Sequence, residues 1–525
     1  MTIPTIQSKK ELPQDSDELR DFSWELILQF HKLYDQYQLL CKSHFGKSSE
    51  KSISEDSEQV ELDDLLLQLE QVEQSDSPQE EFVEVPSHKR RISHPGRNAI
   101  PDDIPREEII LDIPEEEKKC DLCNNARDII GYKEHSVVER IPAQYKVIVY
   151  KRPIYGCSGC KDTLTIAEPA LLPIPKGLAG INLLTFVTLS KYLYHLPLYR
   201  IQRQIYHESR IWFTRSTMVG WIRKLCELLQ SLYDELLIEY QKSRIRHADE
   251  SRIPVQEKGG KIHNRWLWVG VNAPSSDNYV VVFMYNRHRS SKAASVFLGD
   301  APGGYLMTDD LASYESPIRN NSLKSQLCMV HARRKFVEAL DCGIRVDFDK
   351  WVIRKIGQLY RIERYANKKD LDAKARYALR QKYSSRILTE IKDRLINPGF
   401  TVLPKSRIGN AINYMLGNWA RIIRFLEDGD LPIDNNPVEQ IIRPLAIGRN
   451  NWKKAGSENG AKWTAIIYSL IATCKINNVD PHKYFLDIFM RLPMRAEGQS
   501  VKDLTPAEWK KQKDISNATT DYPKS

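Results

Sequence analysis

The amino-acid sequence predicts a multidomain α+β protein, and three observations carry this prediction. Two pairs of cysteines lie within strand-like sequence, a helical pattern runs through residues 176–243, and strand-like and helical segments alternate over residues 244–348. Local patterns of this kind mark separate packed units. We expect an N-terminal amphipathic or coiled-coil helix (1–50), an acidic and then basic linker (51–106), a cysteine-containing domain (107–175), a helical region (176–243), the first part of an α/β core (244–348), a helical insertion (349–430), the last part of the core (431–492) and a flexible tail (493–525).

The composition favours a polyanionic partner. The 525 residues carry a formal charge of +8, and residues 50–84 are strongly acidic, so the remaining chain is more basic than the total suggests. A basic body binds phosphates through counterion release, although a solvated basic surface gives the same total. No apolar run reaches membrane-spanning length, and the first twenty residues do not resemble a signal peptide. Nine cysteines, an odd number, suit a reducing compartment, so we expect a cytoplasmic protein.

The segments before residue 107 have weaker signals. Residues 16–42 repeat apolar side chains at helical spacing, with Ser16 or Asp17 as a cap, and predict either a short coiled coil or a packed helix. Residues 86–106 combine Pro, Gly and basic side chains without periodicity. They predict a linker, or a flexible basic arm that contacts DNA.

The two cysteine pairs predict a structural zinc ribbon. Each CxxC turn supplies two thiolates from one short loop, and tetrahedral zinc takes four. Strand-like sequence, EEIILDI, HSVVERI and QYKVIVYKRPIYGC, surrounds the pairs. The alternative is a coincidence of reduced cysteines in a core. The predicted ligands are Cys120, Cys123, Cys157 and Cys160.

A further cysteine and histidine stand in the segment Cys328-Met-Val-His331. Two more ligands are missing nearby in the sequence, so a buried cysteine and a histidine at the start of a basic helix is the preferred interpretation. Arg333 and Arg334 on that helix are candidates for contacting a phosphate.

Residues 198–228 predict a helix-turn-helix that binds DNA. Two helical segments flank the break IWFTR, and Ser216 is the expected N-cap of the second helix. Basic side chains at Arg215, Arg223 and Lys224 suit a helix in the major groove. Many helical pairs share this pattern without touching DNA.

Residues 244–348 predict an RNase H-like core from the order strand, strand, strand, helix, strand, helix, strand. The strands are expected in IRHAD, RWLWVGVN, YVVVFMYN, GYLMTD and LKSQLCMV, and the helices in KAASVFLG and HARRKFVEAL. In this architecture Asp249 in the first strand and Asp309 after the fourth lie side by side. Two such carboxylates repel each other unless a cation lies between them, and Mg²⁺ prefers oxygen ligands.

A third carboxylate, Glu439, is expected in the first turn of a helix that Asn436 caps and Pro437 begins. A glutamate there can also serve a capping box or the helix dipole. The basic side chains that follow favour a phosphate-binding surface instead. These are Arg443, Arg449, Lys453 and Lys454.

With these motifs the chain resembles the bacterial transposases of the insertion sequence 66 family. The shared motifs include FGKSSEK at 45–51, IPREEIILD at 104–112, both CxxC pairs, IPKGLAG at 174–180, KYLYHLPLYR at 191–200, HADES at 247–251, FLGDAPGGYLMTDDLASY at 297–314, CMVHARRKF at 328–336 and IDNNPVEQIIRPLAIGRNNWKKAGSENGA at 433–461. The resemblance implies a DDE transposase whose RNase H-like domain is interrupted by a helical insertion. It also implies that Asp249, Asp309 and Glu439 are the catalytic triad. Asp310, Ser251 and Gln440 depart from the family pattern, which usually has Gly, Thr and Arg there.

The expected function is therefore cleavage and joining of DNA at transposon ends. Asp249 is expected to bridge two Mg²⁺ ions (with Mn²⁺ as a substitute), while Asp309 and Glu439 each bind one. A water then hydrolyses one strand, and the freed 3′-hydroxyl attacks target DNA. The resemblance also implies double-stranded DNA as partner, an oligomer, small accessory proteins and association with the nucleoid. The alternatives are a non-catalytic, zinc-containing DNA-binding protein and a nuclease that does not join strands.

Overall fold

The computed structural model describes residues 144–151, 154–156, 164–166, 168–257, 259–276, 278–342, 346–496 and 498–520, and single residues between 15 and 33. The described positions from 17 to 33 are helical, and the side chains of Leu19, Trp24, Phe30 and Leu33 among them are exposed. Several predictions lie outside the described residues: the linker 51–106, the strands EEIILDI and HSVVERI, and the four zinc-ribbon cysteines, Cys120, Cys123, Cys157 and Cys160.

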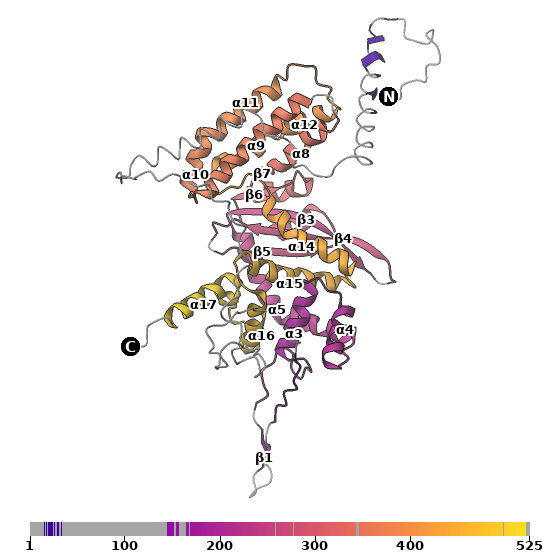
Figure 1. Ribbon diagram of the computed structural model, residues 1–525, viewed down its shortest axis with the longest axis vertical. Helices are drawn as coiled ribbons and strands as arrows, with labels where there is room; N and C mark the ends of the chain where they lie inside the picture. Colours follow the sequence, from indigo (N-terminus) through magenta and orange to yellow (C-terminus); the bar gives the residue numbers. More distant parts are fainter. Residues whose placement is uncertain are drawn as a thin grey trace, which may run out of the picture. The chain divides into compact units, whose positions relative to one another are not determined.

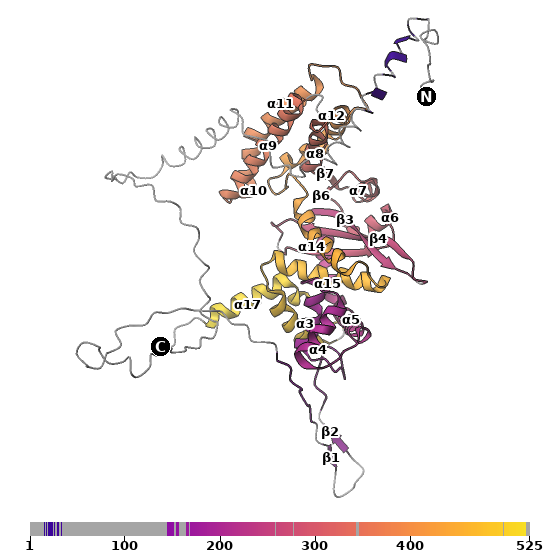
Figure 2. The same cartoon turned by 45° about the vertical axis from the view of Figure 1, so that its right-hand side comes forward.

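The segment between 144 and 166 differs in part from the sequence prediction. Residues 144–151, expected to be strand-like, have no regular structure, and the described side chains of Val147–Tyr150 are exposed. A strand needs a hydrogen-bonded neighbour, and the part of the chain that the structure describes offers none here. The strands β1 (Ile154–Gly156) and β2 (Leu164–Ile166) pair antiparallel with Ile154 opposite Ile166 (Figure 2).

Three helices precede the main sheet: α3 (Ile181–Tyr192), α4 (Leu198–Ser209) and α5 (Arg215–Lys242). The predicted cap at Ser216 is wrong, because the N-cap of α5 is Thr214, two residues earlier, and the helix begins at Arg215. The Thr214 hydroxyl accepts a hydrogen bond of 3.1 Å from the amide of Thr217. Helix α5 buries one apolar stripe, which includes Met218, Leu225, Leu229, Leu232 and Leu236.

The predicted strands and helices of the core are present and form a five-stranded mixed sheet. The strands are β3 (Ile245–Gln256), β4 (Ile262–Asn272), β5 (Val281–Asn286), β6 (Tyr305–Thr308) and β7 (Lys324–Leu327), in the spatial order β5-β4-β3-β6-β7. Strand β4 runs antiparallel to β3 and β5, while β6 and β7 run parallel to β3. Helix α6 (Ser291–Leu298), the short η4 (Ala312–Tyr314) and α7 (Glu315–Asn320) occur between the strands, and α8 (Met329–Leu340) follows β7.

Helices α5 and α6 pack closely on β4. A side chain at Gly270 would lie 2.4 Å from the ring of Tyr240 on α5, so only glycine permits this approach. The ring of Phe297 on α6 contacts Tyr240 and Trp268, at centroid distances of 5.1 and 6.2 Å. The sheet and these helices therefore share one apolar core.

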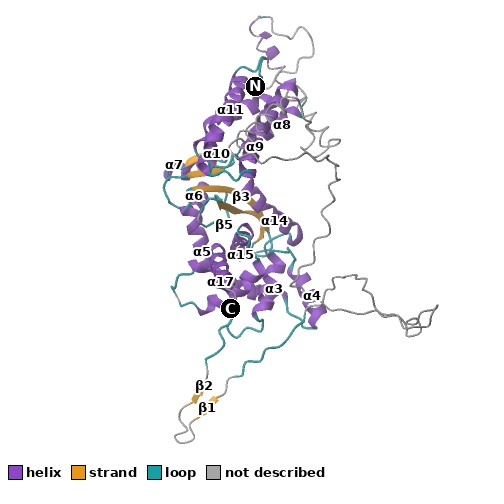
Figure 3. Ribbon diagram, turned by 60° about the vertical axis from the view of Figure 1, so that its left-hand side comes forward, coloured by secondary structure: helices purple, strands orange, loops and turns teal. Residues whose placement is uncertain are grey.

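The C-terminal part of the chain returns to the sheet. Helix α14 (Asn436–Trp452) packs on β3 and β4, and α15 (Glu458–Ile476) lies along β5 (Figures 1 and 3). Hydroxyls of Thr473 and Ser469 on α15 accept hydrogen bonds of 3.0 and 2.8 Å from the amides of Val281 and Phe283. These bonds satisfy edge-strand amides that would otherwise be left unpaired.

Residues 481–520 continue with α16 (Pro481–Arg491), η7 (Leu492–Met494), η8 (Lys502–Leu504) and α17 (Pro506–Thr520). The sequence predicts a loosely ordered tail from 493, whereas Trp509 is buried and its indole donates to Asp487 at 2.8 Å. The hydroxyl of Tyr484 also donates to the carbonyl oxygen of Leu504 at 2.8 Å. Burial of Trp509 therefore packs the otherwise polar helix α17 against α16.

The predicted helical insertion comprises α9 (Val346–Lys368), α10 (Ala373–Leu379), the π-helix η5 (Arg380–Ser384), α11 (Ser385–Ile396), α12 (Arg407–Gly417), α13 (Trp419–Ile422) and η6 (Ile423–Glu427). These helices lie together with α8 (Figure 1), and their buried side chains form a second apolar core. Arg380 is fully buried there and is paired with Glu363 at 2.7 Å, and its other donors bind the carbonyl oxygens of Phe425 and Asp428. A buried guanidinium requires such complete pairing.

Candidate active site

The strand register brings Asp249 and Asp309 to the same level of the sheet. His247 on β3 pairs with Met307 on the parallel strand β6, and each aspartate lies two residues further along its chain. Asp309 follows Thr308, the last residue of β6. Carboxylate oxygens of Asp249, Asp309 and Glu250 all lie within 4.8 Å of one another. The two aspartates are therefore neighbours, as the order of elements predicts.

The carboxylates of Asp249, Glu250 and Asp309 are partly buried, which disfavours their charged forms. Burial, together with the nearby carboxylates of Glu250, Asp309 and Glu439, raises the pKa of Asp249 to about 7. The Glu250 amide opposes this shift with a hydrogen bond of 2.7 Å. Burial also raises the pKa of Asp309, against the influence of Arg289 and His331. A cation would remove this unfavourable interaction between like charges.

Sequence reasoning missed Glu250. Its carboxylate forms an ion pair with Arg289 and accepts a hydrogen bond of 3.0 Å from the hydroxyl of Tyr314. The Arg289 guanidinium also lies 3.9 Å from Asp309 and 5.0 Å from the ring centroid of Trp266. The only signal for Glu250 was its place beside Asp249, since its partners come from other elements.

Helix α14 begins differently from the prediction. The N-cap is Asn435 rather than Asn436, and no side chain caps the helix. The Asn435 side chain instead binds β3: its amide donates to the Ala248 carbonyl oxygen at 3.1 Å, and its oxygen lies 3.0 Å from Nδ1 of His247. Glu439 lies in the first turn but one position beyond that of a capping box, so capping does not account for it.

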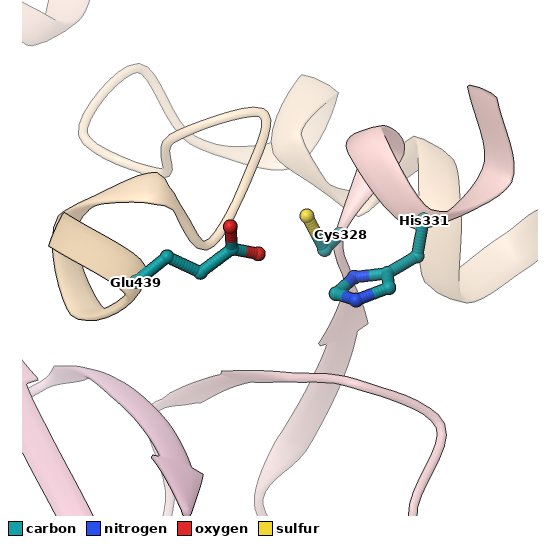
Figure 4. A group of neighbouring side chains, drawn as sticks. All are labelled: Cys328, His331 and Glu439. Atoms are coloured by element: carbon teal, nitrogen blue, oxygen red, sulfur yellow. The ribbon is translucent and has the colours of Figure 1, made fainter. Parts of the chain in front are cut away.

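The carboxylate of Glu439 faces Cys328 and His331 (Figure 4). Ligand atoms of these three side chains lie within 4.8 Å of one another. Glu439 also acts electrostatically on Asp249, so it stands beside the aspartate cluster rather than within it. The carboxylates of both Asp309 and Glu439 act to raise the pKa of His331. Burial and Arg334 outweigh them and lower that pKa, which keeps the imidazole neutral.

Two buried polar atoms at this place have no hydrogen-bond partner among the described residues: Oδ1 of Asp309 and Nδ1 of His331. Buried polar atoms are usually paired, so such orphans mark positions where a ligand would bind. Carboxylate oxygens from Asp249, Asp309 and Glu250 suit a hard divalent cation such as Mg²⁺ or Mn²⁺. The residues present thus fit the cation that the sequence predicts.

The carboxylate of Asp310 binds residues of the helical insertion. It is paired with Arg421 of the helical insertion at 2.8 Å and accepts from the Asn418 amide at 3.3 Å. Asp310 therefore ties the insertion to the end of β6. Gln440 is exposed on α14.

The predicted DNA-binding residues have different environments. Arg449 is partly buried and its guanidinium donates to the Ser251 hydroxyl at 3.0 Å and to the Arg252 carbonyl oxygen, so it joins α14 to β3. Arg333 and Lys454 are half-buried. The exposed members are Arg215, Arg223, Lys224, Arg334, Arg443 and Lys453.

No helix among the described residues is long and apolar enough to cross a membrane.

Four models of known protein families match this chain. A family model described as "Transposase IS66 family" matches residues 176–463, which is more than half of the chain. Three further models match: "Transposase C of IS166 homeodomain" at 32–109, "zinc-finger binding domain of transposase IS66" at 117–161, and "IS66 C-terminal element" at 469–507. The zinc-finger match includes Cys120, Cys123, Cys157 and Cys160, which supports Zn²⁺ as a ligand of this segment.

Similar proteins occur in Sinorhizobium fredii. The uncharacterized protein y4qI is 30% identical over 420 residues, covering 77% of this chain and 76% of its own, and y4jD is 27% identical over 427 residues, covering 78% and 81%. The uncharacterized protein y4hP is 27% identical over 481 residues, covering 86% and 84%. The extent of the family match and these relatives show that the chain belongs to the IS66 family of transposases.

Proposed function

We propose that this transposase is a DDE-type enzyme that binds transposon ends, cleaves one DNA strand and transfers its 3′-end to target DNA. The observation that carries the proposal is the level placement of Asp249 and Asp309 on neighbouring parallel strands, with Glu439 on the adjoining helix α14. The sheet order β5-β4-β3-β6-β7, with β4 alone antiparallel to β3, supports an RNase H-like core. The domain boundaries expected from the sequence are retained as part of the proposal, except for the flexible tail, because α17 packs against α16 through Trp509.

Asp249 and Asp309 would hold the divalent cation, Mg²⁺ or Mn²⁺, with Glu250 or Glu439 as a further ligand. When bound, the cation lowers the pKa of a water and neutralises charge on the phosphate. Arg289 and Tyr314 hold the carboxylate of Glu250 in place. Asn435 and Arg449 hold α14 against β3, which fixes the position of Glu439.

The chemistry is an in-line displacement in two steps. A water oxygen bonds to the phosphorus and loses a proton to solvent, while the bond between the phosphorus and the 3′-oxygen breaks and that oxygen takes a proton from solvent to become a hydroxyl. That hydroxyl then attacks a phosphodiester of target DNA and displaces another 3′-oxygen. No side chain forms a covalent bond to DNA in this scheme.

The DNA-binding surfaces belong to the same proposal. The exposed cations Arg215, Arg223 and Lys224 on α5 suit phosphate or groove contacts, and Arg334, Arg443 and Lys453 suit strands near the carboxylates. The four cysteines would hold a structural Zn²⁺. Assembly as an oligomer on paired ends, with accessory proteins, completes the proposal.

The test compares substitutions of neighbouring carboxylates. Asp249→Asn, Asp309→Asn and Glu439→Gln should each abolish Mg²⁺-dependent cleavage and strand transfer on transposon-end DNA. Asp310→Asn is the matched control, because this neighbour of Asp309 is engaged with Arg421 and should retain activity. Wild-type rates in Asp309→Asn or Glu439→Gln would overturn the assignment.

A second candidate is a DNA-binding protein that has lost catalysis. It is favoured by Gln440 and by the position of Glu439 against Cys328 and His331. Binding of transposon ends without cleavage in either Mg²⁺ or Mn²⁺ would select it. Cleavage without strand transfer would instead identify a nuclease.

A further inference from the structure

Three potential metal ligands from distant parts of the chain meet between α8 and α14. Cys328 directly precedes α8, His331 lies in the first turn of α8, and Glu439 lies in the first turn of α14. Figure 4 shows the Glu439 carboxylate directed toward the sulfur of Cys328 and the imidazole of His331. Their ligand atoms lie within 4.8 Å of one another.

The ligand types select the metal. Sulfur, imidazole nitrogen and a carboxylate oxygen form a set that binds Zn²⁺, whereas Mg²⁺ prefers oxygen alone. Ligand atoms of a tetrahedral zinc ion lie roughly 3.5 Å apart, so side-chain shifts of about 1 Å would close this group around an ion. Among the described residues the cluster contains no fourth ligand, so one position would remain for water or another small ligand.

Backbone amides surround the sulfur of Cys328 and oppose the effect of burial, which raises the pKa of this thiol to about 11. Cys328 is fully buried, and its sulfur accepts a hydrogen bond of 3.3 Å from the backbone amide of Asn435. Amides of Val330 and His331, at the start of α8, also bind this sulfur. Amide donors at a helix N-terminus stabilise negative charge on sulfur. Nδ1 of His331 is buried and has no hydrogen-bond partner among the described residues.

We propose that Cys328, His331 and Glu439 form a second zinc site, separate from the four-cysteine segment, and that zinc bound there inhibits DNA cleavage by holding Glu439. Binding would release the Cys328 thiol proton to solvent. A Glu439 carboxylate bound to this zinc would be withdrawn from the cation at the Asp249–Asp309 cluster. The binding half of this inference stands alone, while the inhibitory half rests on the proposed function.

Zinc content of the full chain tests the binding half. After equilibrium dialysis against Zn²⁺, Cys328→Ser and His331→Ala should each retain one zinc equivalent fewer than the wild type. Cys342→Ser is the matched control, since Cys342 is a buried cysteine just after the same helix and lies outside the cluster. It should retain the wild-type zinc content. Circular dichroism verifies that each variant is folded, so that loss of a ligand is distinguished from unfolding. Equal zinc content in the wild type and all three variants would overturn the site.

Cleavage of transposon-end DNA in Mg²⁺, with and without added Zn²⁺, tests the inhibitory half. We expect a loss of activity with zinc in the wild type and in Cys342→Ser, and a much smaller loss in Cys328→Ser. If the additional zinc binds while cleavage continues at the same rate, the inhibitory role is wrong. If the additional zinc binds and no protein cleaves DNA without zinc, the proposed catalytic function fails while the zinc site stands.

Discussion

The side-chain amide of Asn435 donates a hydrogen bond of 3.1 Å to the carbonyl oxygen of Ala248, the residue before Asp249. Because that amide is the donor, the Asn435 oxygen accepts from Nδ1 of His247 at 3.0 Å. Burial lowers the pKa of His247 to about 4, which leaves a neutral ring with one donor for this bond. Asn435 also precedes α14, so this residue sets the spacing between the strand of Asp249 and the helix of Glu439.

Replacing Asn435 with alanine should destabilise the fold and reduce DNA cleavage. The buried Ala248 oxygen and His247 donor would lose their partners, at a cost of about 1–3 kcal/mol in the free energy of unfolding. Urea unfolding measures this cost. Asn410→Ala, an exposed asparagine, should change stability by less than about 0.5 kcal/mol. Equal stability of the two variants would contradict the role given to Asn435.

The ion pair between Asp310 and Arg421 should contribute little to stability. Their side chains are 40% and 31% exposed, so we expect a coupling energy of about 0.2–1 kcal/mol. A double-mutant cycle with Asp310→Asn and Arg421→Gln measures it. A coupling well above this range would mean that Asp310 anchors the insertion more firmly than its exposure suggests.

Asp349 should make stability depend on pH. It is buried on α9, one of its oxygens has no partner among the described residues, and burial raises its pKa to about 7. Between the unfolded pKa of about 4 and this folded value, the native state binds more protons, so stability falls as pH rises through that range.

The pH dependence of urea unfolding, measured from pH 4 to 8, tests this assignment. Asp349→Asn should remove part of the fall in the free energy of unfolding between pH 4 and 8. The variant should therefore be more stable than the wild type at pH 8 and differ little from it at pH 4. Asp347→Asn, an exposed neighbour in the same helical turn, should keep the wild-type profile. An unchanged profile in Asp349→Asn would show that this carboxyl is not the source.

Helix α5 offers a direct comparison of two candidate caps. Thr214→Ala removes the observed cap and should destabilise the protein by about 1 kcal/mol. Ser216→Ala changes an exposed side chain inside the helix and should have an effect below about 0.5 kcal/mol. Thermal melting of the two variants distinguishes them, and the reverse order would restore Ser216 as the cap.

Magnesium should raise the melting temperature of the wild-type protein at neutral pH. A cation at Asp249 and Asp309 binds the native state alone and adds about 2.7 kcal/mol at a concentration one hundred times its dissociation constant. Asp309→Asn should lose this shift and Asp310→Asn should keep it. Potassium chloride at equal ionic strength controls for screening. A shift that survives Asp309→Asn would place the cation elsewhere.

The sequence by itself determined the features that depend on local pattern. Apolar periodicity marked the strands β3 to β7, and their order predicted that Asp249 and Asp309 lie side by side. The cysteine pairs and long motifs identified the family, because such spacings are read without knowledge of the fold.

The tertiary structure alone decided which groups meet across long separations. Asp310 meets Arg421 of the insertion, and Glu439 meets Cys328 and His331. The sequence predicts Asn436 as the cap of α14, but the N-cap is Asn435. The Asn435 side chain binds β3 because the buried Nδ1 of His247 and carbonyl oxygen of Ala248 require hydrogen-bond partners. These choices depend on how α14 and the insertion pack against the sheet, and packing is set by many weak contacts that no local segment contains.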